Sequence, residues 1–222
     1  MFDWLQKLGG STQGLADIQR QFLQMLQDGR HIFDAAANAL VGGTTPDAIR
    51  NDLYETDLRI NQTEMAVRRG LVVHGTVHGA STFPALLVLM SLVKDAERIG
   101  DYSKNLFEIA CAGVSLGDAE AVQSLVQMKD KISKFLVRAQ NCFESKSVED
   151  SGRLLKEIEA FQKMCDVHVG ELLRAQGRNE APRVLTIRYF KRVVSHIGNV
   201  VSSVVMPLDK LDFYPDKPMS EQ

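Results

Sequence analysis

Apolar residues recur at intervals of three and four along most of the chain, which is the spacing of one face of an α-helix. The first stripe runs from Leu15 to Phe33 and leads to a Gly-Gly pair at residues 42 and 43, so the sequence predicts a helix that ends near these glycines. Thr45 is the expected cap of a second helix, because Pro46 behind it suits a first helical turn. No run of alternating β-branched residues indicates a strand.

The second predicted helix carries its stripe to Leu71, and the glycines between residues 70 and 79 are expected to end it. A third helix opens at Pro84 and is apolar on two faces, so it must lie between neighbours. After Gly117 the pattern starts again, with Asp118 as the expected cap of a fourth helix. The last two helices are predicted from about 149 to 176 and from about 182 to 206.

Two similar trios of helices predict an all-α fold of six helices, built as two three-helix bundles related by a pseudo-twofold internal repeat. The expected organisation is an N-terminal apolar segment and linker (1–13), a first bundle (14–112), a second bundle (117–206) and a C-terminal tail (207–222). Phe2, Trp4, Leu5 and Leu8 make the N-terminal segment apolar. This segment suits either packing onto the core or docking at a membrane surface.

The composition indicates which kinds of molecule the protein can bind and where it resides. The 222 residues include 26 lysines and arginines against 28 acidic residues, so no basic excess attracts nucleic acid. The three cysteines, an odd and widely spaced set, indicate reduced cytoplasm rather than a disulfide framework. No stretch is long enough to cross a bilayer, and we expect peripheral membrane association only through a partner. So apolar a chain is also expected to form a homodimer.

Candidate chemistry lies on the second and third helices. Glu97 and Asp101 are four residues apart and therefore share one helical face. Asp57 and Asn61 have the same spacing on the preceding helix, and a hairpin would bring the two pairs level with each other. Three carboxylates and an amide oxygen are hard ligands, suited to Mg, Mn, Ca or oxidised iron.

These carboxylates also fit two other classes of helical protein. Lys94, Arg98 and Lys104 lie close to Glu97 in sequence, so the acidic residues could belong to an ordinary salt-bridged face of a metal-free helical adaptor. A ferritin-like di-iron oxidase would need Glu-x-x-His pairs, which the sequence does not contain. Because no phosphate-binding loop or catalytic triad occurs either, we expect that the protein is not an enzyme.

The stretch Asp95-Ala96-Glu97-Arg98-Ile99-Gly100-Asp101-Tyr102, with Asn105 after it, closely resembles the signature of the PhoU family. Asp57-Leu58-Arg59-Ile60-Asn61 resembles the partner motif on the preceding helix. A weaker copy occupies residues 188–196 with Asn199, so that Arg192 matches Arg98 and Asn199 matches Asn105. The resemblance extends over residues 14–206.

The resemblance implies a two-bundle fold, multinuclear metal sites on the acidic motifs, and negative regulation of phosphate uptake through a phosphate transporter and a sensor kinase. The second copy has Lys191 and Ser195 where the first has its acidic pair. We therefore predict one metal site, for Fe, Mn, Mg or Zn, in the first repeat only. Its predicted ligands are Asp57, Asn61, Glu97 and Asp101. Supporting or structural roles are expected for Arg98, Asn105, Asp166, Arg192, His196 and Asn199.

The sequence allows more than one arrangement in the second repeat and in the Gly-rich segment. Asp166 matches Asp57 in one register, while another register places Glu159 there. His196 has Asp166 as its expected hydrogen-bond partner. His74 and His78 would form a transition-metal pair if their segment were helical, but the neighbouring glycines favour a loop with solvated histidines.

Overall fold

A computed structural model of the chain describes residues 13–175 and 179–211. In these ranges it contains six long α-helices and no strand, as the hydrophobic pattern predicts. The helices are α2 (Gln13–Val41), α3 (Pro46–His78), α4 (Phe83–Cys111), α5 (Ala119–Ser145), α6 (Val148–Arg174) and α7 (Ala181–Val205). Two short 3₁₀ turns, η1 (Ala80–Thr82) and η2 (Leu208–Lys210), complete the elements. The predicted N-terminal segment and most of the predicted tail lie outside the described residues.

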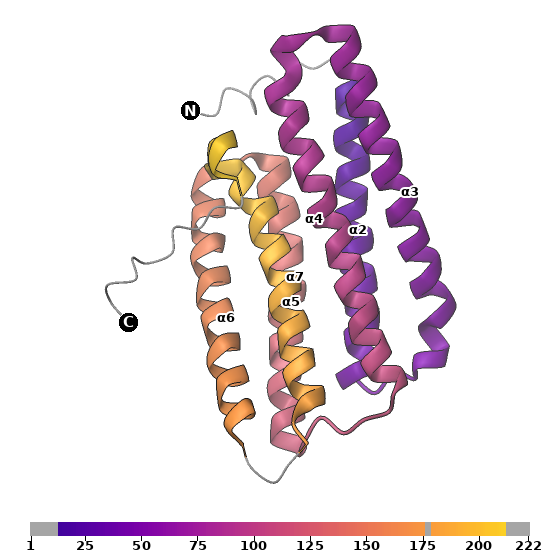
Figure 1. Cartoon of the computed structure of the whole chain (residues 1–222), viewed down its shortest axis with the longest axis vertical. Helices are drawn as coiled ribbons and strands as arrows, with labels where there is room; N and C mark the ends of the chain where they lie inside the picture. The colour runs from indigo at the N-terminus through magenta and orange to yellow at the C-terminus, as the bar shows by residue number, and fades with distance from the viewer. Residues whose placement is uncertain (1–12, 176–178, 212–222) are drawn as a thin grey trace.

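The six helices form two three-helix groups that lie side by side with their axes roughly aligned (Figure 1). α2, α3 and α4 pack together in the first group, and α5, α6 and α7 in the second. α4 packs against α7 and α2 packs against α5, so these four helices join the groups. The buried side chains form one hydrophobic cluster that includes residues of all six helices. The two repeats therefore share a core.

Edge-to-face aromatic packing shows how closely the repeats are joined. Phe33 of α2 and Phe190 of α7 are fully buried, and their ring centroids lie 5.9 Å apart at an interplanar angle of 60°. Aromatic pairs in this arrangement stabilise a core beyond the burial of their apolar area. This contact joins the first helix of one repeat to the last helix of the other.

Local signals explain most of the helix ends. The Asp118 carboxylate accepts a hydrogen bond of 3.0 Å from the Ala121 amide and caps α5, as predicted. Ser147 caps α6 in the same way through the Asp150 amide. Thr45 stands at the N-cap position of α3, but its side chain makes no capping hydrogen bond, so that part of the prediction is wrong.

The prediction that glycines between residues 70 and 79 end the second helix is confirmed for Gly79 and wrong for the glycines before it. α3 passes through Gly70 and Gly75 and ends only at His78, where Gly79 adopts a positive φ of 77°. A Cβ atom at Gly75 would lie 3.0 Å from side-chain atoms of Phe83 and Leu86. Gly75 therefore allows α4 to approach α3 closely, and its role is packing rather than helix termination.

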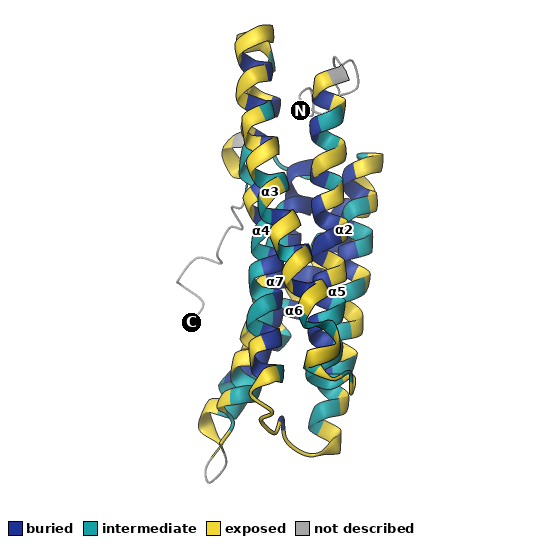
Figure 2. Cartoon of the chain, turned by 90° about the vertical axis from the view of Figure 1, so that its right-hand side faces the viewer, coloured by how far each residue is buried: buried dark blue, intermediate teal, exposed yellow. Residues whose placement is uncertain are grey.

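The long α3 and α4 carry their connecting turn beyond the end of the second three-helix group. In Figure 1 this turn is the uppermost part of the molecule, and Figure 2 shows exposed residues around it. The start of α2 lies near the same end, because the Cβ position of Gly14 is 3.7 Å from the imidazole of His74. The acidic motif residues lie farther down the α3–α4 pair.

Candidate functional site

The predicted ligands come together where α3 and α4 face each other. We call Asp57, Asn61, Glu97 and Asp101 the acidic cluster. The ammonium of Lys104 lies 2.9 Å from Asp57 Oδ2 and 3.2 Å from Asp101 Oδ1, so one lysine bridges the two helices. The structure thus brings the carboxylates of α3 and α4 to opposite sides of a single cation.

A second cation lies on the outer side of the acidic cluster. Arg98 Nη1 is 3.1 Å from Asp101 Oδ2, and its Nε is 3.6 Å from Glu97 Oε2. The Asn61 side-chain amide is directed at Asp57, with 3.4 Å between Nδ2 and Oδ2. Arg98 and Lys104 together supply positive charge against the three carboxylates, so the cluster keeps a net negative charge when all three are ionised.

Glu97 is the member of the cluster with a perturbed acidity. Burial raises its pKa, the neighbouring Asp101 carboxylate raises it further, and the pKa reaches about 7 despite the opposing effect of Arg98. Its side chain is only 17% exposed. Near neutral pH this carboxyl group is therefore partly protonated, because burial and the neighbouring carboxylate both disfavour its charged form.

The donor chemistry of the acidic cluster fits a hard cation, because carboxylate and amide oxygens are the ligands that such ions prefer. The arrangement of the side chains is that of an ion-pair network. Across residues 13–175 and 179–211, no three acidic, histidine or cysteine side chains converge in the manner of a metal centre. A metal ion would have to take the place of the Lys104 ammonium between Asp57 and Asp101.

The second repeat has an ion pair at the corresponding place. Lys191 Nζ lies 2.5 and 2.6 Å from the two carboxylate oxygens of Asp166, and Arg188 Nη1 is 3.6 Å away from the same group. Gln162 donates a 3.0 Å hydrogen bond to Ser195 Oγ. Ser195 is the position that matches Asp101, so Gln162 stands in the place of Asp57. Both predicted registers, with Asp166 or Glu159 in that place, are therefore wrong.

The structure also shows a buried polar group that is absent from the predicted site residues. Asp95 is 6% exposed, and its Oδ1 lies 2.7 Å from His196 Nδ1 and 2.8 Å from Asn199 Nδ2. The expected contact of His196 with Asp166 is therefore wrong. The position of Asp95 within the apolar row of α4 is a signal for a buried carboxylate, but its partners lie on α7 and could not be assigned.

Aromatic rings extend this buried contact toward the acidic cluster. The Tyr102 ring stacks on the His196 ring with centroids 5.6 Å apart, and it also lies 6.0 Å from the Tyr189 ring. Asn105 lines a polar pocket of about 390 Å³ together with Arg98 and Lys104. The contacts of Asp95 and Tyr102 therefore connect α4, the helix that carries Glu97 and Asp101, to α7 of the other repeat.

The remaining predicted residues lie apart from the acidic cluster. Arg192 is exposed on α7. His74 and His78 belong to α3, so the loop expected there is wrong, and their ring centroids are 4.3 Å apart. Burial lowers the pKa of His74, and the charge of His78 lowers it further.

Comparison with known proteins relates this chain to PhoU proteins. Residues 22–110 match the model of the PhoU domain. Among solved structures, PhoU from Pseudomonas aeruginosa aligns with a TM-score of 0.74 and 19% identity, covering 86% of this chain and 95% of that one. The phosphate transport system regulatory protein PhoU from Streptococcus pneumoniae aligns with a TM-score of 0.71 and 18% identity, covering 92% of this chain and 95% of that one. No curated protein matches.

The chain is thus an all-helical protein with the PhoU fold. The match to the PhoU domain covers most of α2, the whole of α3 and nearly all of α4, and with them the whole acidic cluster. None of the helices in the described part has a stretch that is both long and apolar enough to span a bilayer.

Proposed function

We propose that this protein regulates phosphate transport by binding a protein of the transport system, either a phosphate transporter or its sensor kinase, and that it catalyses no reaction. Two observations support the proposal. The PhoU domain match covers the residues that form the acidic cluster, and a similar structure is that of a phosphate transport system regulatory protein. In the structure itself, the proposal rests mainly on a third observation, which is that Asp57 of α3 and Asp101 of α4 converge on the same side of the two helices.

We further propose that the acidic cluster binds one metal ion in the first repeat, held by Asp57, Asn61, Glu97 and Asp101. The ion would supply positive charge to three neighbouring carboxylates, of which Glu97 already has a raised pKa. Its binding requires that Lys104 leaves the space between Asp57 and Asp101. No second site is proposed, because Lys191 pairs with Asp166 at the corresponding place.

A metal-free adaptor is the second candidate, and one observation favours it. Lys104 and Arg98 already neutralise much of the acidic cluster through ion pairs of 2.9 to 3.2 Å. In this alternative the cluster is a rigid polar surface for the partner protein, and Lys104 permanently takes the role that a metal ion would have.

Phosphate uptake in the source cells tests the regulatory role. Deletion of the gene should change the rate of uptake when phosphate is plentiful, and the wild-type gene should restore it. A Glu97→Gln/Asp101→Asn variant should restore it poorly, whereas an Arg192→Gln variant, altered at an exposed position of the second repeat, should restore it fully. Uptake that is the same with and without the gene would contradict the proposal.

Elemental analysis separates the two candidates. Wild-type protein, purified without chelators or a metal-binding tag, should carry Fe, Mn, Mg or Zn that the Glu97→Gln/Asp101→Asn variant lacks. Equal or negligible metal in both proteins, also after incubation with each metal, would leave the metal-free adaptor. In that case the uptake experiment still reports on regulation.

A further inference from the structure

The end of the α3–α4 hairpin differs in chemistry from the rest of the chain. We call residues 65–94, which include the end of α3, η1 and the start of α4, the hairpin tip. This stretch of sequence contains no aspartate or glutamate, whereas Arg68, Arg69 and Lys94 give it positive charge. The whole chain, by contrast, has 28 acidic residues and a formal net charge of −2. The tip is therefore a local basic region on an acidic protein.

Large apolar side chains are exposed on several sides of the hairpin tip. Val73 and Val77 of α3 are 57% and 70% exposed, and Val72 is 62% exposed on a neighbouring face of the helix. On α4, Phe83 and Leu87 are 48% and 57% exposed. Exposed apolar groups concentrated at one end of a protein indicate a contact surface rather than the scatter found on any monomer.

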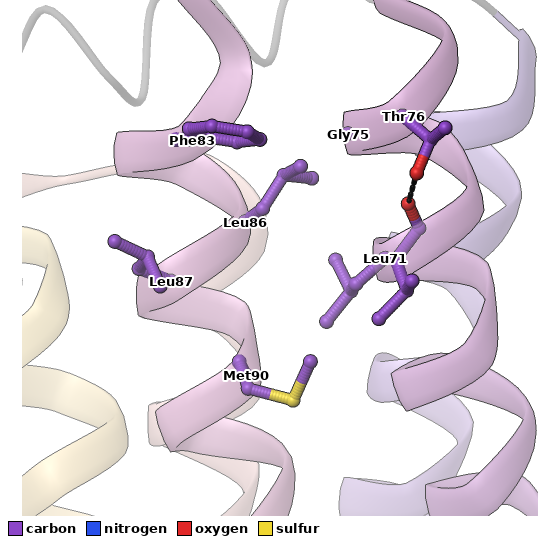
Figure 3. A pocket seen from close by; sticks show the side chains of 8 residues that line it. Leu71, Gly75, Thr76, Phe83, Leu86, Leu87 and Met90 are labelled. Carbon is purple, nitrogen blue, oxygen red and sulfur yellow. Dashed lines mark hydrogen bonds between the residues drawn. The ribbon is translucent and has the colours of Figure 1, made fainter. Parts of the chain in front are cut away.

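A groove between the two helices continues this surface. It has a volume of about 310 Å³, and Leu71, Gly75, Phe83, Leu86 and Met90 are among its lining residues (Figure 3). The only hydrogen bond drawn there joins Thr76 Oγ1 to the carbonyl of Val72 within α3. The groove therefore offers apolar contacts and no polar group directed at a ligand.

Position and charge indicate what covers the hairpin tip. The turn between α3 and α4 projects past the second three-helix group, so a flat surface can approach it end-on (Figures 1 and 2). Arg69 is exposed and forms no ion pair within the described residues, and Arg68 bonds to Glu64 on the side away from the turn. Asp17 of α2 lines a pocket together with Arg69 and the exposed valines, but its carboxylate is paired with Arg20. Exposed apolar side chains beside the unpaired Arg69 therefore complement the interface of an anionic bilayer.

The described part of the chain begins beside the hairpin tip. α2 begins at Gln13, and Gly14 lies beside His74 of the hairpin tip. Residues 1–12 contain Phe2, Trp4, Leu5 and Leu8. This apolar stretch of sequence joins the described chain at Gln13.

We propose that the hairpin tip is a docking surface for an anionic lipid bilayer. Val73, Val77 and Phe83 enter the boundary between headgroups and acyl chains, and Arg69 lies at the level of the lipid phosphates. This contact is direct and goes beyond the membrane association through a partner that the sequence led us to expect. It would place the long axis of the protein upright on the membrane in which a transporter resides.

Vesicle flotation with the full chain tests the proposal. Wild-type protein should float with vesicles of equal parts phosphatidylcholine and phosphatidylglycerol, more weakly with phosphatidylcholine alone, and less at high salt. A Val73→Gln/Val77→Gln/Phe83→Gln variant should partition about tenfold less. Arg69→Gln should weaken binding to the anionic vesicles and leave binding to the neutral ones unchanged.

A matched variant controls for the loss of exposed apolar side chains elsewhere on the protein. Val167 and Leu173 of α6 are 59% and 70% exposed, so Val167→Gln/Leu173→Gln removes similar apolar groups outside the hairpin tip and should bind like wild type. Circular dichroism checks that each variant is folded, and the single change Val77→Gln replaces the triple change if the latter unfolds.

Three outcomes would overturn the proposal. The first is a wild-type protein that stays with the bottom fraction on both kinds of vesicle, as expected if residues 1–12 or a second copy cover the groove. The second is equal flotation of wild type and the triple variant. The third is loss of binding in a Phe2→Gln/Trp4→Gln variant while the triple variant floats normally, because binding would then reside in the N-terminal segment alone.

Discussion

His196 Nδ1 lies 2.7 Å from Asp95 Oδ1, although the two residues are 101 positions apart. The contact is buried, with 19% and 8% of the two side chains exposed, and it joins α7 to α4. Asn199 donates to the same carboxylate oxygen over 2.8 Å. Each repeat therefore satisfies polar groups of the other in a region that water reaches poorly.

Replacement of Asp95 should be costly. Asp95→Ala leaves His196 and Asn199 without their acceptor, and a loss of about 2–3 kcal/mol in the free energy of unfolding is expected from chemical denaturation. The exposed pair of His31 and Asp52, also 2.7 Å apart, is the matched control, and Asp52→Ala should cost less than about 0.5 kcal/mol. Equal losses for the two variants would show that burial of the Asp95 contact adds nothing.

The acidity of Glu97 predicts how stability depends on pH in metal-free protein. Because the pKa is raised to about 7 from 4.5, the unfolded chain releases this proton first as pH rises. The contribution of Glu97 is favourable below pH 4.5, declines between pH 4.5 and 7, and is fully lost above that range. Glu97→Gln should therefore stabilise the protein at pH 8, by an order of 1 kcal/mol, and have little effect at pH 4.

Glu157 serves as the control of opposite sign. The hydrogen bonds from Arg138 lower its pKa, so its contribution is present above the unfolded value of 4.5 and is lost as pH falls through its lowered value. Glu157→Gln should accordingly destabilise the protein at pH 8. Thermal melts of both variants across this pH range, after chelation, provide the measurement; a Glu97→Gln protein less stable than wild type at pH 8 contradicts the assigned acidity.

Lys104 should compete with metal for the acidic cluster. Lys104→Met removes the ammonium that bridges Asp57 and Asp101 and keeps a side chain of similar length. If the cluster binds metal, the affinity for Mn²⁺ measured by calorimetry should rise about tenfold, because the ion no longer displaces a cation. Lys129→Met, which removes an ammonium far along the chain on α5, should leave the affinity unchanged. Weaker binding by the Lys104 variant would argue that the lysine assists the ion.

The shared core predicts one cooperative unfolding transition for both repeats. Phe190→Ala in α7 removes the ring that packs on Phe33 of α2 and should cost about 3–5 kcal/mol. The loss should appear equally in hydrogen exchange of slow amides in the first and second three-helix groups. Separate transitions, with only α5, α6 and α7 destabilised, would instead show that each bundle folds on its own.

Much of the fold could be predicted from the sequence, because the helical period depends on neighbouring residues alone. The acidic cluster was also predictable, since Glu97 and Asp101 share a face of one helix and the hairpin brings Asp57 close. The bridging position of Lys104 was not, because a flexible side chain at that position can point to solvent or across to α3. In the structure its ammonium lies between the carboxylates of Asp57 and Asp101.

Contacts between distant segments account for the other differences. The hydrogen bonds of Asp95 depend on how α4 and α7 meet, and no local pattern specifies that arrangement. The passage of α3 through Gly70 and Gly75 has a similar cause. Tight packing of Ile18 and Phe83 against these glycines outweighs their poor helix propensity.

The shared core also bears on how the two repeats can change in evolution. Lys191 and Ser195 stand where the first copy has its acidic pair, and their partners Asp166 and Gln162 belong to their own repeat, so the difference leaves the contacts of the first copy intact. Substitutions at Phe33 or Phe190 have no such freedom, because a change of volume in one repeat alters the fit of the other. Selection can therefore modify the two surfaces independently, while the interior is inherited as a single unit.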